Sequence, residues 1–136
     1  MQNPPPGQTG KSSTGLDENI AALLSYVFGW VSGLIFFLIE KDSKLVRFHA
    51  MQSILFNAFI AVVGIGLWIV VFILALIASQ LADVLGTILG LLGTLIYLAF
   101  SLLLLIAWVM CLIRAYQKQY FKLPIIGNLA EKFASK

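Results

Sequence analysis

The residues best able to do chemistry form a polar stripe at the start of an apolar stretch: Arg47, His49, Gln52, Ser53 and Asn57. On a helix, His49 shares a face with Gln52 and Ser53, because residues three and four positions apart are neighbours. Asn57 lies four positions beyond Ser53 and continues that face. Within a membrane, such a stripe has two interpretations: a site that binds a solute, a lipid headgroup or a proton, or a set of interhelical hydrogen bonds that fixes packing.

Other kinds of chemical site lack the residues they need. The chain has one histidine and one cysteine, too few for a typical metal site, so we predict no metal and no cofactor. No serine has a plausible histidine and acid partner, and no glycine-rich phosphate loop follows a strand. The sequence therefore predicts no catalytic residues. An enzyme built on His49 and Arg47 is the weakest alternative.

The composition indicates what surrounds these residues. Hydrophobic residues make up 60% of the 136 residues and charged residues only 11%, whereas a soluble domain has about 45–50% and about 25%. So few charges cannot cover the surface of a small soluble protein. The nine basic residues stand in short clusters beside apolar runs, without an aromatic platform, so we expect no nucleic-acid partner. The solvent of this chain is predicted to be lipid.

Three long apolar stretches predict an all-α integral membrane protein with three transmembrane helices, at about residues 20–39, 54–78 and 84–113. Twenty helical residues reach about 30 Å, the thickness of the hydrocarbon core. These helices form one predicted transmembrane domain over residues 14–122. Residues 1–13 are rich in Pro, Gly, Gln and Ser and are predicted to be a disordered tail.

The last segment, residues 123–136, is predicted to be a short amphipathic helix at the membrane interface. Leu123 and Pro124 end the preceding helix. Apolar residues then recur every three to four positions, with Glu131 and Lys132 on the other side. This pattern is typical of a helix that lies in the plane of a membrane surface.

Basic residues predict the orientation of the three spans. Lys41, Lys44 and Arg47 follow the first span, five more follow the third, and only Lys11 lies on the opposite side. Since basic segments stay in the cytoplasm, we expect a multi-pass protein of the cell membrane with its N-terminus outside and its C-terminus cytoplasmic.

Small residues recur at four-residue spacing in two of the predicted spans: Ser25, Gly29 and Gly33 in the first, and Gly86 and Gly90 in the third. Such residues let two helices approach closely. The partner helix belongs either to the same chain or to a second copy of it, so helix packing within the monomer and a homo-oligomer both remain open.

Several strings in the chain resemble one known family. They are Leu16-Asp17-Glu18-Asn19-Ile20-Ala21-Ala22-Leu23-Leu24-Ser25-Tyr26, followed by Trp30 and Gly33, then Glu40-Lys41-Asp42, Val46-Arg47-Phe48-His49-Ala50-Met51-Gln52-Ser53 and Tyr120-Phe121-Lys122-Leu123-Pro124-Ile125-Ile126-Gly127. Together they are similar to small, largely uncharacterised prokaryotic membrane proteins grouped with the chloroplast inner-envelope protein-import component, over about residues 14–133. The resemblance implies a multi-pass membrane protein. Its plant relatives are assigned to a protein-conducting translocon.

The sequence thus favours a non-enzymatic membrane scaffold or interaction protein of that import-component-like family. The first alternative is an oligomeric channel, transporter or translocation component that uses the polar stripe; a single small subunit has too few helices to enclose a pore, so this alternative requires assembly. A membrane enzyme is the second alternative. The expected partners are the lipid bilayer, further copies of the chain and other membrane proteins.

Overall fold

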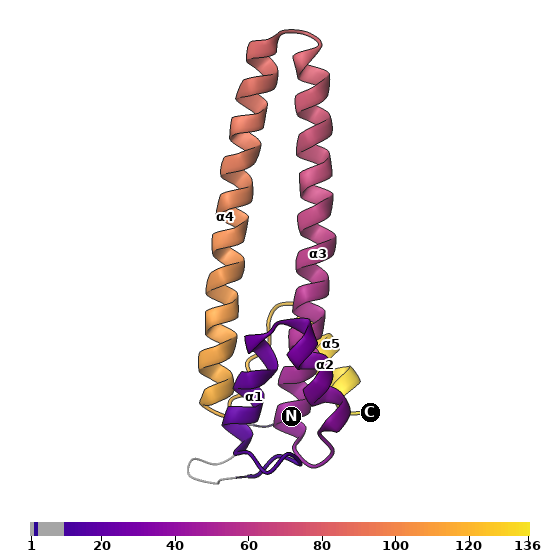
Figure 1. Cartoon of the computed structure of the whole chain (residues 1–136), viewed down its shortest axis with the longest axis vertical. Coiled ribbons are helices and arrows are strands. Elements are labelled where there is room, and N and C mark those ends of the chain that lie inside the picture. The colour runs from indigo at the N-terminus through magenta and orange to yellow at the C-terminus, as the bar shows by residue number, and fades with distance from the viewer. Residues whose placement is uncertain (1, 3–9) are drawn as a thin grey trace. The chain divides into compact units, whose positions relative to one another are not determined.

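The computed structural model describes residue 2 and residues 10–136, and this part of the chain is helical without strands. The five helices are α1 (Glu18–Val27), α2 (Trp30–Ile39), α3 (Lys44–Ser79), α4 (Asp83–Tyr116) and α5 (Ile126–Ala134) (Figure 1). The predicted all-α class is confirmed.

The chain divides into two compact units. The terminal unit comprises Met1–Ala58 and Ala107–Lys136, and the hairpin unit comprises Phe59–Ile106. The terminal unit holds α1, α2, α5, the first part of α3 and the last part of α4. The two ends of the chain therefore build one unit, and the middle of the chain builds the other.

The hairpin unit consists of residues 59–79 of α3 and 83–106 of α4, joined by a short turn. Its large apolar side chains are mostly exposed, as Val62 at 73% and Leu103 at 66% illustrate. At 1.5 Å per residue, residues 59–79 reach about 31 Å, which matches the hydrocarbon thickness of a bilayer. These two helices have the length and composition of membrane spans.

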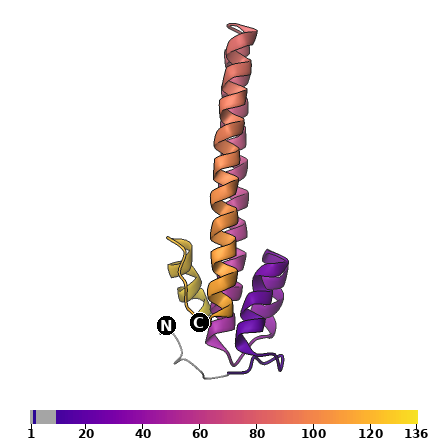
Figure 2. The same cartoon turned by 90° about the vertical axis from the view of Figure 1, so that its left-hand side faces the viewer.

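The prediction of three spans is wrong, because the first apolar stretch is not one helix. It breaks at Phe28 and Gly29 into α1 and α2, which lie side by side (Figure 2). Gly29 has φ +61°, a conformation that suits a residue without a Cβ atom. The Ser32 hydroxyl secures the break by accepting from the Phe28 amide at 3.2 Å and lying 3.1 Å from the Ser25 carbonyl oxygen. Each ten-residue helix reaches about 15 Å, half of a bilayer core.

The second and third predicted spans do form continuous helices, but both extend beyond the predicted limits. Helix α3 begins ten residues before the predicted residue 54, and α4 runs without interruption from Asp83 to Tyr116. The additional turns of both helices belong to the terminal unit. The part of each helix that exceeds the thickness of a bilayer is therefore packed within the terminal unit, so tilt alone need not account for it.

A small apolar core holds α5 in the terminal unit. Ala130 and Ala134 are buried against Phe48 of α3. Their small side chains let α5 approach closely, whereas Leu129 and Phe133 remain 42% and 43% exposed. A helix is thus present within the predicted segment 123–136, and one of its faces packs on protein. Its predicted place at the membrane interface stays a prediction.

The predicted disordered tail, residues 1–13, lies mostly outside the described residues. Within the described part, Ser12 and Ser13 are ordered by contacts with the segment after α2. The ordered chain therefore begins before residue 14, where the sequence placed the start of the folded domain.

Candidate functional site

The centre of the terminal unit is a hydrogen-bonded network formed by Tyr26, His49 and Gln52, all completely buried. The His49 Nε2 atom lies 2.9 Å from the Gln119 carbonyl oxygen, and Nδ1 lies 3.1 Å from the Tyr26 hydroxyl. A carbonyl oxygen only accepts, so Nε2 carries the proton, and Nδ1 of the neutral ring accepts from Tyr26. Both ring nitrogens are therefore engaged within the protein.

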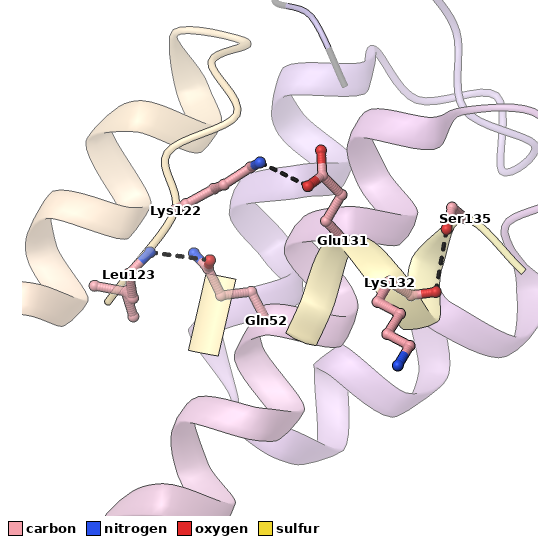
Figure 3. Close-up of polar contacts among 6 residues, drawn as sticks. All are labelled: Gln52, Lys122, Leu123, Glu131, Lys132 and Ser135. Carbon is pink, nitrogen blue, oxygen red and sulfur yellow. Dashed lines mark hydrogen bonds and ion pairs between the residues drawn. The ribbon is translucent and has the colours of Figure 1, made fainter. Parts of the chain in front are cut away.

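Gln52 ties α3 to the segment that follows α4. Its Nε2 group donates to the Phe121 carbonyl oxygen at 2.9 Å and to the Tyr26 hydroxyl at 3.1 Å. Its Oε1 atom accepts from the Leu123 amide at 3.3 Å (Figure 3). One side chain thus satisfies two backbone groups of a segment without helical hydrogen bonds, which otherwise would be costly to bury.

Ser53 and Asn57 lie beside the turn between α1 and α2. The Ser53 hydroxyl donates to the Gly29 carbonyl oxygen at 3.0 Å, and a Cβ atom on Gly29 would meet the Asn57 side-chain oxygen at 3.0 Å. Asn57 itself donates to the Ser53 carbonyl oxygen at 2.9 Å. Ser53 therefore holds the broken backbone at Gly29, and the Asn57 side chain lies close beside it.

Arg47 is half-buried and binds backbone carbonyl groups. Its Nη1 atom donates to Glu40 at 2.9 Å and Phe37 at 3.4 Å, and its Nε atom donates to Ala134 at 3.4 Å. The guanidinium also lies 4.7 Å from the centre of the Phe37 ring. It thereby joins the ends of α2 and α5 to α3.

Glu40 is a completely buried carboxylate that was not among the predicted site residues. It accepts from the hydroxyl of Ser12, from the amide and hydroxyl of Ser13 and from the amide of Ser43. Burial alone would raise the pKa of Glu40, but these hydrogen bonds outweigh burial and lower that pKa to about 2. The ionised carboxylate joins the N-terminal segment to the start of α3.

The predicted packing residues fall into three groups. Ser25 is buried, and its hydroxyl donates to the Ala21 carbonyl oxygen of its own helix. Gly33 and Gly86 lie where a Cβ atom would meet the Ala50 carbonyl oxygen at 2.9 Å and the Ser79 Cβ at 2.7 Å. By contrast, a Cβ atom on Gly90 would meet nothing within 4 Å.

Gly93 was not part of the predicted four-residue pattern. It lies closer to the opposite helix of the hairpin unit than Gly86 does. A Cβ atom there would collide with the side chain of Val71. The seam between α3 and α4 in this unit therefore follows Gly86 and Gly93, seven residues apart, and this spacing returns to the same helix face. The sequence identified the motif of small residues but not its register.

Sequence reasoning also missed the partners of the polar stripe. Tyr26 lies in an apolar run, yet its carbonyl oxygen accepts from the Trp108 indole at 3.2 Å and its hydroxyl joins the network. Cys111 is buried beside Gln52, with Sγ 3.7 Å from Nε2. The presence of a tyrosine within an otherwise apolar segment was the available signal, because a buried hydroxyl needs a partner.

Chemically, this site is a closed one. Among the described residues, every buried side-chain nitrogen and oxygen has a hydrogen-bond partner. The described residues contain no group of three or more His, Cys, Asp or Glu side chains suited to a metal ion. The stripe therefore has the geometry of a structural network that joins α3 to segments from both ends of the chain, in line with its packing interpretation.

Comparisons with known proteins identify the relatives of the chain. A family model described as the magnetosome magnetite crystal formation protein family matches residues 16–130. A UPF0132 membrane protein of Methanocaldococcus jannaschii is 38% identical over 125 residues, which cover 92% of this chain and 96% of the relative. A UPF0132 membrane protein of Archaeoglobus fulgidus is 33% identical over 117 residues, covering 86% and 95%. No solved structure matches the chain significantly.

These relatives confirm a prokaryotic membrane-protein family and a membrane location. The tie to chloroplast protein import, which the sequence strings suggested, is not among the findings and stays a prediction.

Proposed function

The chain belongs to the magnetosome magnetite crystal formation protein family, and from this premise we propose that it is a non-enzymatic membrane scaffold. In this proposal, the hairpin unit anchors the chain in the bilayer and the terminal unit is a rigid module that binds other membrane proteins. The observation that carries it is the closed network of Tyr26, His49 and Gln52, whose polar atoms are used within the fold. A catalytic or transport site needs polar groups that reach a ligand, and here those groups stabilise a fixed shape.

The magnetite-related description of the family model is not extended to this chain as a mineral-binding activity. The described residues lack a cluster of metal-ligating side chains. The property that we propose to be shared with the relatives is a membrane location.

The proposal includes a topology with both chain ends in the cytoplasm. Ser13 hydrogen-bonds to Glu40 and Asp42, so the segment before α1 and the segment after α2 lie together. Helix α1 therefore begins, and helix α2 ends, on the same side of the membrane. The expected external N-terminus depended on three spans and is not part of this proposal. All nine Lys and Arg residues lie outside residues 59–106. This distribution supports the proposal that both ends are cytoplasmic and the turn at Gln80 is outside.

Cysteine labelling tests this topology, and the single native Cys111 simplifies it. In a Cys111→Ser background, Gln80→Cys should react with a membrane-impermeant maleimide in intact cells. Lys11→Cys and Ser135→Cys should react only after the membrane is opened. Labelling of Lys11→Cys in intact cells would overturn the proposed cytoplasmic placement of the N-terminal segment.

Photo-crosslinking in native membranes tests the scaffold role. A photoreactive residue at exposed positions of the terminal unit, such as Ile35 or Asn128, should give protein adducts of reproducible mass. The same probe at Gln80, in the turn of the hairpin unit, is the control and should give none. Adducts to lipid alone from every position would refute the scaffold proposal.

A flux measurement separates the scaffold from the channel alternative. For a channel assembled around the polar stripe, His49, Gln52 and Ser53 would face a lumen, yet all three are completely buried within one chain. Liposomes that contain the purified protein should therefore show no more ion or solute leakage than empty liposomes. Leakage clearly above that of empty liposomes would favour the channel.

A further inference from the structure

One cavity in the terminal unit is lined by basic residues that the network does not use for its own closure. Its volume is about 680 Å³, and its lining includes Lys41, Lys44, Arg47, Tyr120, Ser135 and Lys136. Ligand pockets in proteins commonly measure about 300–1,000 Å³. The cavity brings together the segment after α2, the first turn of α3 and the segment after α5.

The charge of this cavity is strongly positive. Four of its lining side chains are cationic, and none of its described lining residues is acidic. The two nearest carboxylates along the chain, Glu40 and Asp42, accept hydrogen bonds from Ser13 and do not line the cavity.

Two further carboxylates, Glu18 and Glu131, lie close enough to the lining residue Tyr120 to act on it. Glu131 is paired with Lys122. Glu18 accepts from the Ser43 hydroxyl. An anion that enters the cavity therefore still meets four positive charges that have no acidic partner among the described lining residues.

Two of the cations are held in place by the fold. Arg47 is fixed by three backbone carbonyl groups and by the Phe37 ring. The Lys136 ammonium lies 5.8 Å from the centre of the Phe133 ring. Because these side chains are already ordered, binding an anion costs them little further conformational entropy.

Exposed apolar side chains lie within three positions of the lining residues along the chain. Leu38 and Ile39, just before Lys41 in the chain, are 67% and 45% exposed. Phe133, three residues before Lys136, is 43% exposed. A ligand that fits both features has an anionic head and an apolar tail.

We propose that this cavity binds the phosphate-bearing headgroup of an anionic phospholipid, whose acyl chains lie against these exposed apolar side chains. Basic pockets at the cytoplasmic face of membrane proteins bind such headgroups, and each lysine near the surface contributes a several-fold increase in affinity. This inference rests on the proposed placement of the chain ends at the membrane surface. In this view lipid surrounds the hairpin unit and is also a specific ligand of the terminal unit.

Native mass spectrometry of the full-length protein in detergent tests the site. Phosphatidylglycerol and phosphatidylcholine with identical acyl chains are the two probes. The protein should retain phosphatidylglycerol preferentially, and Lys41→Gln/Lys44→Gln should weaken that binding about 10–30-fold. The control Lys11→Gln/Lys132→Gln removes the same charge from exposed positions outside the cavity and should weaken binding less than threefold.

Three results would overturn the proposal: equal retention of the two lipids, equal losses in the two double variants, or binding of inorganic phosphate alone as tightly as the lipid. The last result would assign the cavity to a soluble phosphate. Lys41 and Lys44 are exposed and outside the network, so a thermal melt of the double variant should match that of the parent protein. The labelling and crosslinking results are independent of lipid retention, so failure of this site is distinguishable from failure of the scaffold proposal.

Discussion

The terminal unit and the hairpin unit use opposite means to become stable. The terminal unit buries Tyr26, His49, Gln52 and Glu40 in its interior, and hydrogen bonds specify how its segments meet. The hairpin unit exposes most of its large apolar side chains, and its two helices meet along Gly86 and Gly93. Polar pairing therefore provides specificity in one unit, whereas lipid and close helix contact suffice in the other.

Replacement of Gln52 should show this contrast most strongly. Gln52→Leu keeps a similar volume but leaves the Leu123 amide and the Phe121 carbonyl group buried without their partner. Each lost partner costs about 1–3 kcal/mol, so we expect roughly 3–5 kcal/mol of destabilisation in thermal or chemical unfolding in detergent. Gln80→Leu, the same change at an exposed turn residue of the hairpin unit, is the control and should be nearly neutral. Equal effects of the two variants would mean that the network does not stabilise the terminal unit.

The second largest effect should be a loss of folding stability at acidic pH that arises from Glu40. The pKa of Glu40 in the folded protein is about 2, below its ordinary value of 4.5, so the unfolded chain takes up the proton first. Stability is therefore complete above pH 4.5 and is lost as the pH falls towards 2. The loss should be roughly 2–3 kcal/mol, measured as the unfolding midpoint against pH.

Glu40→Gln should flatten that part of the pH profile. The amide cannot titrate, although it also loses strength as an acceptor from Ser12 and Ser13, so the variant should be less stable at neutral pH. A profile with an unchanged slope between pH 4.5 and 2 would assign the acid sensitivity to other carboxylates.

Two glycine substitutions, one in each unit, should give the smallest individual changes in unfolding free energy. Gly33→Ala places a Cβ atom 2.9 Å from the Ala50 carbonyl oxygen, a backbone atom that cannot easily move, and should cost about 1–3 kcal/mol. Gly66→Ala, in the hairpin unit, meets nothing within 4 Å and should stabilise α3 by about 0.5–1 kcal/mol, since alanine favours a helix interior. The sign of the change in unfolding free energy checks this comparison, and the same sign for both would contradict it.

The sequence predicted the hairpin unit better than the terminal unit. A charge-free run measures membrane length well, so the second and third apolar stretches became α3 and α4. The same reasoning merged α1 and α2 into one span, because counting charges does not detect a backbone break secured by Gly29 and Ser32.

The polar stripe shows a similar limit. Helical spacing placed His49, Gln52 and Ser53 on one face, and all three are buried together. Their partners, however, are Tyr26 and backbone groups near residue 120, which no local pattern connects to them. A buried Glu40 is equally hard to foresee, because its donors come from Ser12 and Ser13 nearly thirty positions earlier.

The assembly of the terminal unit from both chain ends has a consequence for biogenesis. Gln52 bonds to the carbonyl group of Phe121 and the amide of Leu123, which the ribosome adds about 70 residues later. A nascent chain can insert α3 while its first half still lacks these partners, so the terminal unit is completed only after α4 and the segment that follows it have been made. Truncated products would keep their anchor but display an open N-terminal half, a state that membrane proteases could recognise and remove.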